Sequence, residues 1–186
     1  MSEAERERPV REGRVGWALV GLGPLTLSQV LRAFARCRES RAVALVGGDP
    51  PSMQTLARRY GIPAGGVYGF DTYELIAQNA EIQIVYVVLP EALHVEYAMR
   101  AARAGKHVLC ERPIPATGSS SLSRAALGAD ARLRIAYRHA LESTSQGGDD
   151  PLVAEIDRFS QCVRRIAARI AASKGHGGST RMQETA

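Results

Sequence analysis

Residues 15–23 read VGWALVGLG, an apolar run that begins with a β-branched residue and ends in glycines. This pattern is typical of a buried strand that enters a tight turn. After the turn, Leu27, Val30, Leu31 and Phe34 recur at positions i, i+3, i+4 and i+7, which predicts one face of a helix. A strand, a glycine turn and a helix in this order indicate the first unit of an α/β fold.

The same alternation continues along most of the chain. Further strands are predicted at 41–49, 82–90, 107–110 and 132–138, and helices at 52–60, 72–78, 95–104 and 122–127. Near-continuous apolar runs such as 82–90 suit parallel strands that are covered on both faces. Strands that alternate with helices imply right-handed crossovers. We therefore predict an α/β fold with a doubly wound, mostly parallel sheet.

The two ends of the chain differ from this pattern. We expect 1–13 to be a disordered arm, 14–142 the folded domain, 143–150 a turn-rich linker and 175–186 a flexible tail. Between linker and tail, residues 151–174 predict a long C-terminal helix, with Asp150 as its cap and Pro151 in its first position. One apolar seam follows this helix: Leu152, Ile156, Phe159, Val163, Ile166 and Ile170.

The composition of the 186 residues favours one soluble globular domain, with 45% apolar and 23% charged residues. The net charge is +5, but the arginines are scattered and aromatic residues make up only 5%, which disfavours nucleic-acid binding. No apolar run approaches the ~20 residues that span a bilayer. The first residues also lack the apolar core of a secretion signal, so we expect a cytoplasmic protein without membrane contact.

The cysteines and histidines show no metal-ligand spacing. Cys37, Cys110 and Cys162 are widely spaced and form no CxxC pair. We therefore expect no metal site, and we interpret each cysteine as a small buried residue in a reducing compartment.

The glycine turn after the first strand has the context of a dinucleotide-binding motif, since it follows a strand and precedes a helix. Gly21 permits the tight turn, and Gly23 allows the backbone to approach a diphosphate at the helix N-terminus. We assign Gly21, Gly23, Pro24 and Leu25 as cofactor-binding candidates. Thr26 occupies the place of the third glycine of the GxGxxG pattern, and a purely structural turn gives a similar sequence.

Two further strand ends carry candidate residues. The second predicted strand ends in Gly48 and Asp49, and an acid there can bind the adenosine ribose, although Asp49 can equally cap a turn. This leaves the choice between NAD and NADP open. The strand at 82–90 ends in Leu89 and Pro90, and His94 follows at the start of a helix, where it faces either the ligand crevice or the protein core.

Together, these stretches resemble the N-terminal domain of the glucose-fructose oxidoreductase, inositol dehydrogenase and rhizopine-catabolism dehydrogenase family, most closely its glucose-fructose oxidoreductase branch. The resemblance covers about 15–142 and rests on ALVGLG (18–23), ALVGGD (44–49), VYVVLPEALHVEYAMRAARAGKHVLCERP (85–113) and IAYRHALE (135–142). It implies a Rossmann-type sheet that binds NAD or NADP. It also implies hydride transfer to or from a small sugar or cyclitol.

The resemblance gives roles to residues after the last predicted strands. The family motif Glu-Lys-Pro is Glu111-Arg112-Pro113 here, which implies that Glu111 holds ribose hydroxyls and that Arg112 points into the catalytic cleft. Arginine keeps the charge but cannot give up a proton near neutral pH. Arg138 matches a family arginine that approaches the cofactor. We assign Arg112 and His94 as catalytic candidates.

A large family segment has no counterpart here. Family enzymes continue into an open sheet domain with most substrate contacts, whereas this chain passes from 135–142 through a short linker to PLVAEIDRFSQCVR. The sequence resembles a member without its central sheet, in which turnover is reduced or lost. The alternatives are a non-catalytic Rossmann-like interaction module, with self-association through exposed apolar surface, and a decayed reading frame.

Overall fold

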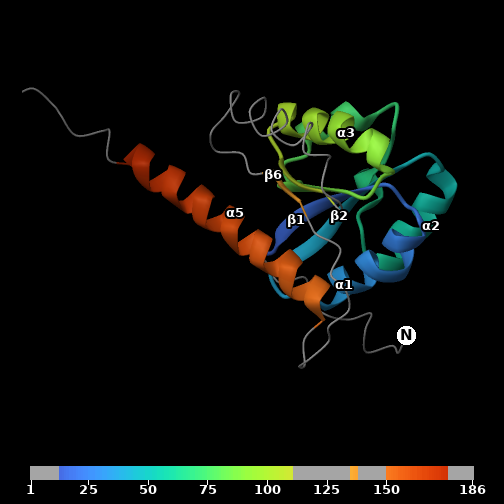
Figure 1. The fold of residues 1–186 in the computed structure, drawn as a ribbon, viewed down its shortest axis with the longest axis horizontal. Helices are drawn as coiled ribbons and strands as arrows, with labels where there is room; N and C mark the ends of the chain where they lie inside the picture. Colours follow the sequence, from blue (N-terminus) through green and yellow to red (C-terminus); the bar gives the residue numbers. More distant parts are fainter. Residues whose placement is uncertain (1–12, 111–134, 138–149, 176–186) are drawn as a thin grey trace, which may run out of the picture.

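The computed structural model describes residues 13–110, 135–137 and 150–175. Its centre is a six-stranded sheet with the order β3-β2-β1-β4-β5-β6, in which every neighbouring pair is parallel (Figure 1). The strands are β1 (Val15–Val20), β2 (Ser40–Gly47), β3 (Val67–Gly69), β4 (Ile84–Val87), β5 (His107–Cys110) and β6 (Ile135–Tyr137). The predicted parallel α/β sheet is confirmed.

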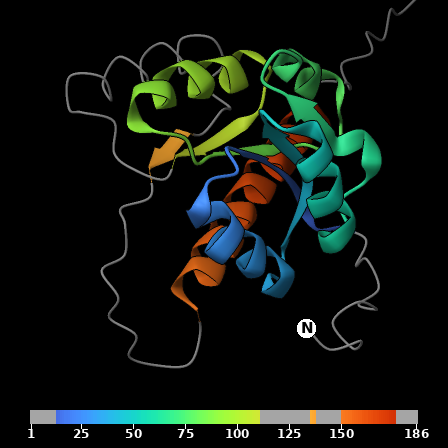
Figure 2. The same cartoon turned by 90° about the vertical axis from the view of Figure 1, so that its right-hand side faces the viewer.

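Helices cover both faces of the sheet (Figure 2). One face carries the π-helical turn η2 (Thr26–Val30), α1 (Leu31–Arg36), α2 (Pro50–Tyr60) and α5 (Pro151–Gly175). The other face carries η4 (Tyr73–Gln78) and α3 (Glu91–Arg103), and a short 3-10 turn, η3 (Ala64–Gly66), precedes β3. The doubly wound arrangement and the long C-terminal helix are therefore confirmed.

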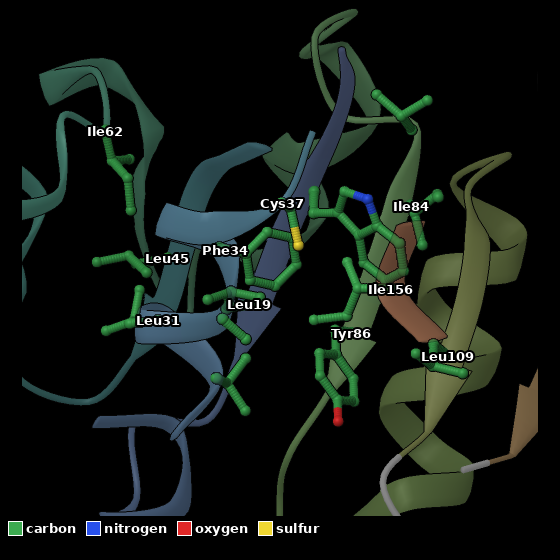
Figure 3. Close-up of a cluster of buried hydrophobic side chains, with 14 of the residues drawn as sticks. Leu19, Leu31, Phe34, Cys37, Leu45, Ile62, Ile84, Tyr86, Leu109 and Ile156 are labelled. Carbon is green, nitrogen blue, oxygen red and sulfur yellow. The ribbon is translucent and has the colours of Figure 1, made fainter. Parts of the chain in front are cut away.

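Alternation along β1 divides the core into these two layers. Trp17 and Leu19 point to the α1 and α5 side, whereas Ala18 and Val20 point to the α3 side. Figure 3 shows the first layer, in which Phe34 of α1 and Ile156 of α5 meet side chains from the sheet. Every residue of β1 is buried, as expected for a central parallel strand.

Helix α5 is fixed to the sheet by a buried polar chain as well as by apolar contacts. The indole Nε1 of Trp17 donates to Ser160 Oγ at 2.9 Å, and the hydroxyls of Ser160 and Ser40 lie 2.7 Å apart. Ser40 also donates to Asp157 Oδ1 at 2.7 Å, and Asp157 accepts the backbone N–H of Arg38 at 2.8 Å. The first half of α5 therefore belongs to the core, while its later turns extend away from the sheet (Figure 1).

The predicted helix ends are also observed. Asp150 Oδ1 accepts the Leu152 N–H at 3.0 Å, so Asp150 caps α5 ahead of Pro151. Gly61 ends α2 in the left-handed region at φ 67°. The predicted helix at 122–127 and the arm, linker and tail lie outside the described residues. Within the described chain, no helix is both long enough and apolar enough to cross a bilayer.

Three sequence-based expectations were wrong. Leu27 is 42% exposed although it was expected to share a buried face with Val30. The π-helical turn places an additional residue in that turn, which moves Leu27 off the face. Val95 was expected to share the apolar face of the helix at 95–104 with Ala98 and Ala102. It is exposed because the buried face of α3 is centred on His94 and on Tyr97, whose ring packs edge-on against Tyr73. Cys162 is exposed rather than buried.

Replacing Ile156 by alanine tests the docking of α5. Ile156 is fully buried, so Ile156→Ala should lower the free energy of unfolding by about 2–5 kcal/mol. Gln161→Ala on the exposed side of the same helix should change it by less than about 0.5 kcal/mol. Urea denaturation measures both, and an unchanged Ile156→Ala midpoint would show that α5 does not pack on the sheet in solution.

Candidate dinucleotide-binding site

The strand order places a switch point between β1 and β4, and we refer to the carboxyl edge of the sheet at this point as the crevice. The chain leaves β1 toward β2 on one side of the sheet, and it leaves β4 toward β5 on the other. In open parallel sheets, ligands bind outside the carboxyl ends of the strands at such a switch point. The loops that follow β1, β2 and β4 contain most of the candidate residues.

Gly21 joins the two central strand ends. Its N–H donates to Val46 O at 3.0 Å, and Val88 N–H donates to Val20 O at 2.8 Å, so the strand pairing continues beyond β1 and β4. The φ of Gly21 is 97°, a region that favours glycine. A Cβ atom there would collide with the Val88 carbonyl oxygen and lie 2.9 Å from Leu89 Cδ2. The conformation and the close approach both require glycine.

Gly23 has a different environment. A Cβ atom on Gly23 would meet no atom of the described chain within 4 Å, so the space that these residues leave above this glycine is open. Helical turns run from Pro24 through η2 and α1. The first N–H groups of a helix have no intrahelical partner, and proline in the first position has none to lose. Leu25, which is half-buried, therefore offers its N–H group at a helix start that suits an anion.

Thr26 has a role that the sequence pattern did not reveal. Its side chain is fully buried, and its hydroxyl donates to the Gly21 carbonyl at 2.7 Å. This bond fixes the orientation of the peptide group between Gly21 and Leu22. In the sequence, Thr26 was noted only because it replaces the third glycine of the GxGxxG pattern. Its spacing of five residues from Gly21 was the one feature that could have indicated this hydrogen bond.

At the end of β2, the absence of a side chain at Gly47 lets Met53 and Leu22 pack against the backbone. Gly47 is buried, and a Cβ atom there would lie 2.9 Å from Met53 Sδ and 3.3 Å from Leu22 Cδ1. Gly48 and Asp49 are exposed. The Asp49 side chain makes no capping hydrogen bond to α2, although its backbone carbonyl accepts the Met53 N–H at 3.0 Å. The two hypotheses for Asp49 were ribose binding and capping of a turn. The structure does not support capping by its carboxylate.

At the end of β4, Leu89 is half-buried and Pro90 is exposed. His94, on the first turns of α3, is only 1% exposed, and its Nε2 lies 2.5 Å from the Leu89 carbonyl oxygen. Its Nδ1 is also buried and has no hydrogen-bond partner among the residues that the structure describes. As placed, His94 faces the protein rather than the crevice, and neither ring nitrogen is open to a substrate.

Three predicted site residues, Glu111, Arg112 and Arg138, lie outside the described residues. The described chain reaches the same edge at Cys110, which ends β5 beside Val87 of β4 and Tyr137 of β6. Burial raises the pKa of the Cys110 thiol to about 12, so this cysteine stays protonated and is a poor nucleophile. Among the residues that the structure describes, no group of His, Cys, Asp and Glu could hold a metal ion.

The strand order and the glycine-lined edge define a Rossmann-type domain of the dinucleotide-binding class. A model of the oxidoreductase family with an NAD-binding Rossmann fold, GFO_IDH_MocA, matches residues 15–137. The chain belongs to this family.

Known proteins that resemble the chain include enzymes of sugar metabolism. An uncharacterized oxidoreductase, ORF334 of Rhizobium meliloti, is 37% identical over 100 residues, which cover 54% of this chain and 29% of that protein. The D-xylose 1-dehydrogenase (NADP(+)) 2 of Haloferax volcanii is 30% identical over 105 residues, covering 56% and 31% of the two chains. The similarity thus spans about a third of each relative's length.

Solved structures share the fold. The aldose-aldose oxidoreductase of Caulobacter crescentus, complexed with glycerol, has a TM-score of 0.58 and 38% identity, covering 62% of this chain and 35% of that chain. A 3-ketoreductase from Actinomadura kijaniata, solved with NADP, has a TM-score of 0.58 at 24% identity, covering 67% and 38%. The second likeness concerns the fold alone.

Replacing Gly21 by alanine tests the contact between the loop after β1 and the loop after β4. Gly21→Ala combines an unfavourable φ with a collision against Val88, so it should lower the free energy of unfolding by more than the about 1–3 kcal/mol of backbone strain alone. Gly61→Ala is the matched control, because Gly61 has φ 67° but open space around it. Equal losses for both variants in urea denaturation would contradict the close approach.

Proposed function

We propose that this chain binds NAD at the switch point between β1 and β4, as the cofactor-binding domain of an oxidoreductase that acts on a sugar or cyclitol. The observation that supports this most is the asymmetry of the first loop. Gly21 is pressed against Val88, while the space above Gly23, at a helix start, is open. A diphosphate needs such close access to backbone N–H groups.

Each part of the crevice has a proposed role. Gly21, Gly23, Pro24 and Leu25 hold the diphosphate, and Gly48 and Asp49 face the adenosine ribose. Leu89 and Pro90 flank the nicotinamide side. By the family resemblance, Glu111 holds the second ribose, Arg138 approaches the cofactor and Arg112 polarises the substrate oxygen. The bound nicotinamide accepts or donates the hydride.

The relatives support the proposed substrate class. One matched relative is named a D-xylose dehydrogenase and one solved neighbour an aldose-aldose oxidoreductase. Hydride transfer also requires a proton acceptor and a surface that holds the substrate carbon against the nicotinamide. Arg112 is a poor proton acceptor near neutral pH, and His94 is buried. We therefore propose cofactor binding with weak turnover, in a reducing, cytoplasmic location that suits the free thiols of Cys37 and Cys110.

Titration of NADH fluorescence tests cofactor binding. The wild-type protein should bind NADH, and Gly23→Leu should weaken binding at least about tenfold, or ~1.4 kcal/mol, because leucine fills the space reserved for the diphosphate. Gly65→Leu is the matched control, since a Cβ atom on Gly65 also meets nothing within 4 Å and it lies on η3. The proposal fails if the wild-type protein binds neither NADH nor NADPH, or if Gly23→Leu binds as the control does.

We further propose a preference for NAD over NADP. Asp49 is exposed and makes no side-chain cap, so its carboxylate can accept the ribose hydroxyls and repel a 2′-phosphate. Pro50 and Pro51 begin α2, and proline has no N–H. The start of α2 therefore lacks two of the donors with which a helix binds an anion.

Comparing the dissociation constants of NADH and NADPH tests this preference. We expect NADH to bind at least about tenfold more tightly than NADPH, and Asp49→Ser to narrow the ratio by removing the negative charge. Asp71→Ser, on an exposed loop after β3, should leave the ratio unchanged. Tighter binding of NADPH by the wild-type protein would rule out this role of Asp49.

A further inference from the structure

The two helices that flank the crevice share a hydrogen-bond pattern. Each sends a buried polar side chain back to a loop carbonyl five residues earlier: Thr26 to Gly21 at 2.7 Å and His94 to Leu89 at 2.5 Å. Thr26 is 0% exposed and His94 is 1% exposed. The two loops also touch, because Gly21 packs against the backbone of Val88 and the side chain of Leu89.

The geometry defines the proton position on His94. A carbonyl oxygen only accepts hydrogen bonds, so Nε2 must carry the proton and donate to Leu89. In the neutral ring, Nδ1 then holds a buried lone pair that no described residue pairs with. A buried polar atom without a partner destabilises the fold relative to an apolar side chain of similar size. Packing alone therefore gives no reason for histidine here.

The hydrogen bond from His94 restrains the ψ angle of Leu89, the backbone angle that sets the course of the chain between β4 and α3. Pro90 has φ −56°, which its ring fixes, and it precedes α3 as the N-cap residue. The peptide bond between Leu89 and Pro90 is planar, so the ψ angle of Leu89 determines both the direction of its carbonyl and the position of Pro90. Holding the Leu89 carbonyl fixes this angle.

We propose that His94 is a positioning residue that, through the Leu89 carbonyl, holds the corner Leu89–Pro90 in the shape that the nicotinamide side of the crevice requires. The role in cofactor binding rests on the proposed function. It differs from proton transfer at the substrate, because both ring nitrogens of His94 are buried. In this proposal, His94 acts only through its hydrogen bond to the Leu89 carbonyl, and the cofactor does not contact the imidazole ring.

Three substitutions separate the hydrogen bond from packing. Glutamine can place its amide N–H near the position of Nε2, asparagine is one bond shorter and reaches only the position of Nδ1, and leucine fills the space without a donor. NADH affinity should fall at least about fivefold in His94→Leu and His94→Asn. His94→Gln should stay within about threefold of wild type. His94→Leu should shift the urea midpoint little, because removal of the unpartnered Nδ1 and loss of the bond to the Leu89 carbonyl have opposite effects on stability.

Hydrogen exchange reports on the conformation of the corner Leu89–Pro90 in the absence of cofactor. The Leu93 N–H donates to the Pro90 carbonyl at 2.9 Å, so its hydrogen exchange reports on this turn. Exchange at Leu93 should be at least about tenfold faster in His94→Leu than in wild type, and His94→Gln should restore protection. Val95→Gln, an exposed neighbour on α3, is the control and should change neither affinity nor exchange.

The outcomes separate the two proposals. If the wild-type protein binds neither NADH nor NADPH, the proposed function fails, and exchange at Leu93 alone decides whether His94 holds the corner. If His94→Leu retains wild-type affinity or wild-type exchange at Leu93, the positioning role is overturned. Equal loss of affinity in His94→Leu and His94→Gln would also overturn it, because the restored donor would then have no effect.

Discussion

The close approach of the Gly21 backbone to the Val88 carbonyl determines the shape of the carboxyl edge of the sheet. Beside it, the bond from Val88 N–H to Val20 O continues the pairing of β4 with β1 past the end of β4. Because β1 and β4 are neighbours while their chains leave in opposite directions, this edge is also where the crevice opens. Any side chain at position 21 would force the two loops apart.

On the α1 and α5 side of the sheet, β1 is fixed by Trp17. Trp17 packs edge-on against Phe34 and Tyr86, with ring centroids 5.4 and 6.2 Å away, and donates to Ser160 of α5. The Ser160, Ser40 and Asp157 chain pairs the polar groups that this packing buries. The central strand thus has side chains fixed on both sides, which gives the flanking loops a rigid base.

Much of the fold was predictable from the sequence because strand and helix periodicities differ clearly. Five of the six strands, their parallel arrangement, the end of α2 at Gly61 and the Asp150 cap follow from local chemistry, whereas the short strand β3 was not predicted. Leu27 was assigned to the wrong side because a π-helical turn changes the periodicity, and apolar spacing alone does not reveal such a turn.

The site was predictable in part. The glycine turn and the strand-end residues gather at one edge, since parallel strands end on the same side. The role of Thr26 and the direction of His94 were not predictable, because both depend on hydrogen bonds to carbonyls that only the folded loops bring near. The chemistry of Glu111, Arg112 and Arg138 rests on the family resemblance.

The dinucleotide that we propose lies over the loop at Gly23. A titration of isotope-labelled protein with NAD, followed by the backbone amide resonances in NMR spectra, tests this position. We predict that the largest shifts fall on Leu22, Gly23, Leu25 and Thr26, with further shifts at Gly48, Asp49 and Leu89. Unchanged amides in these loops at saturating NAD, or shifts confined to the far turns of α5, would contradict the claim.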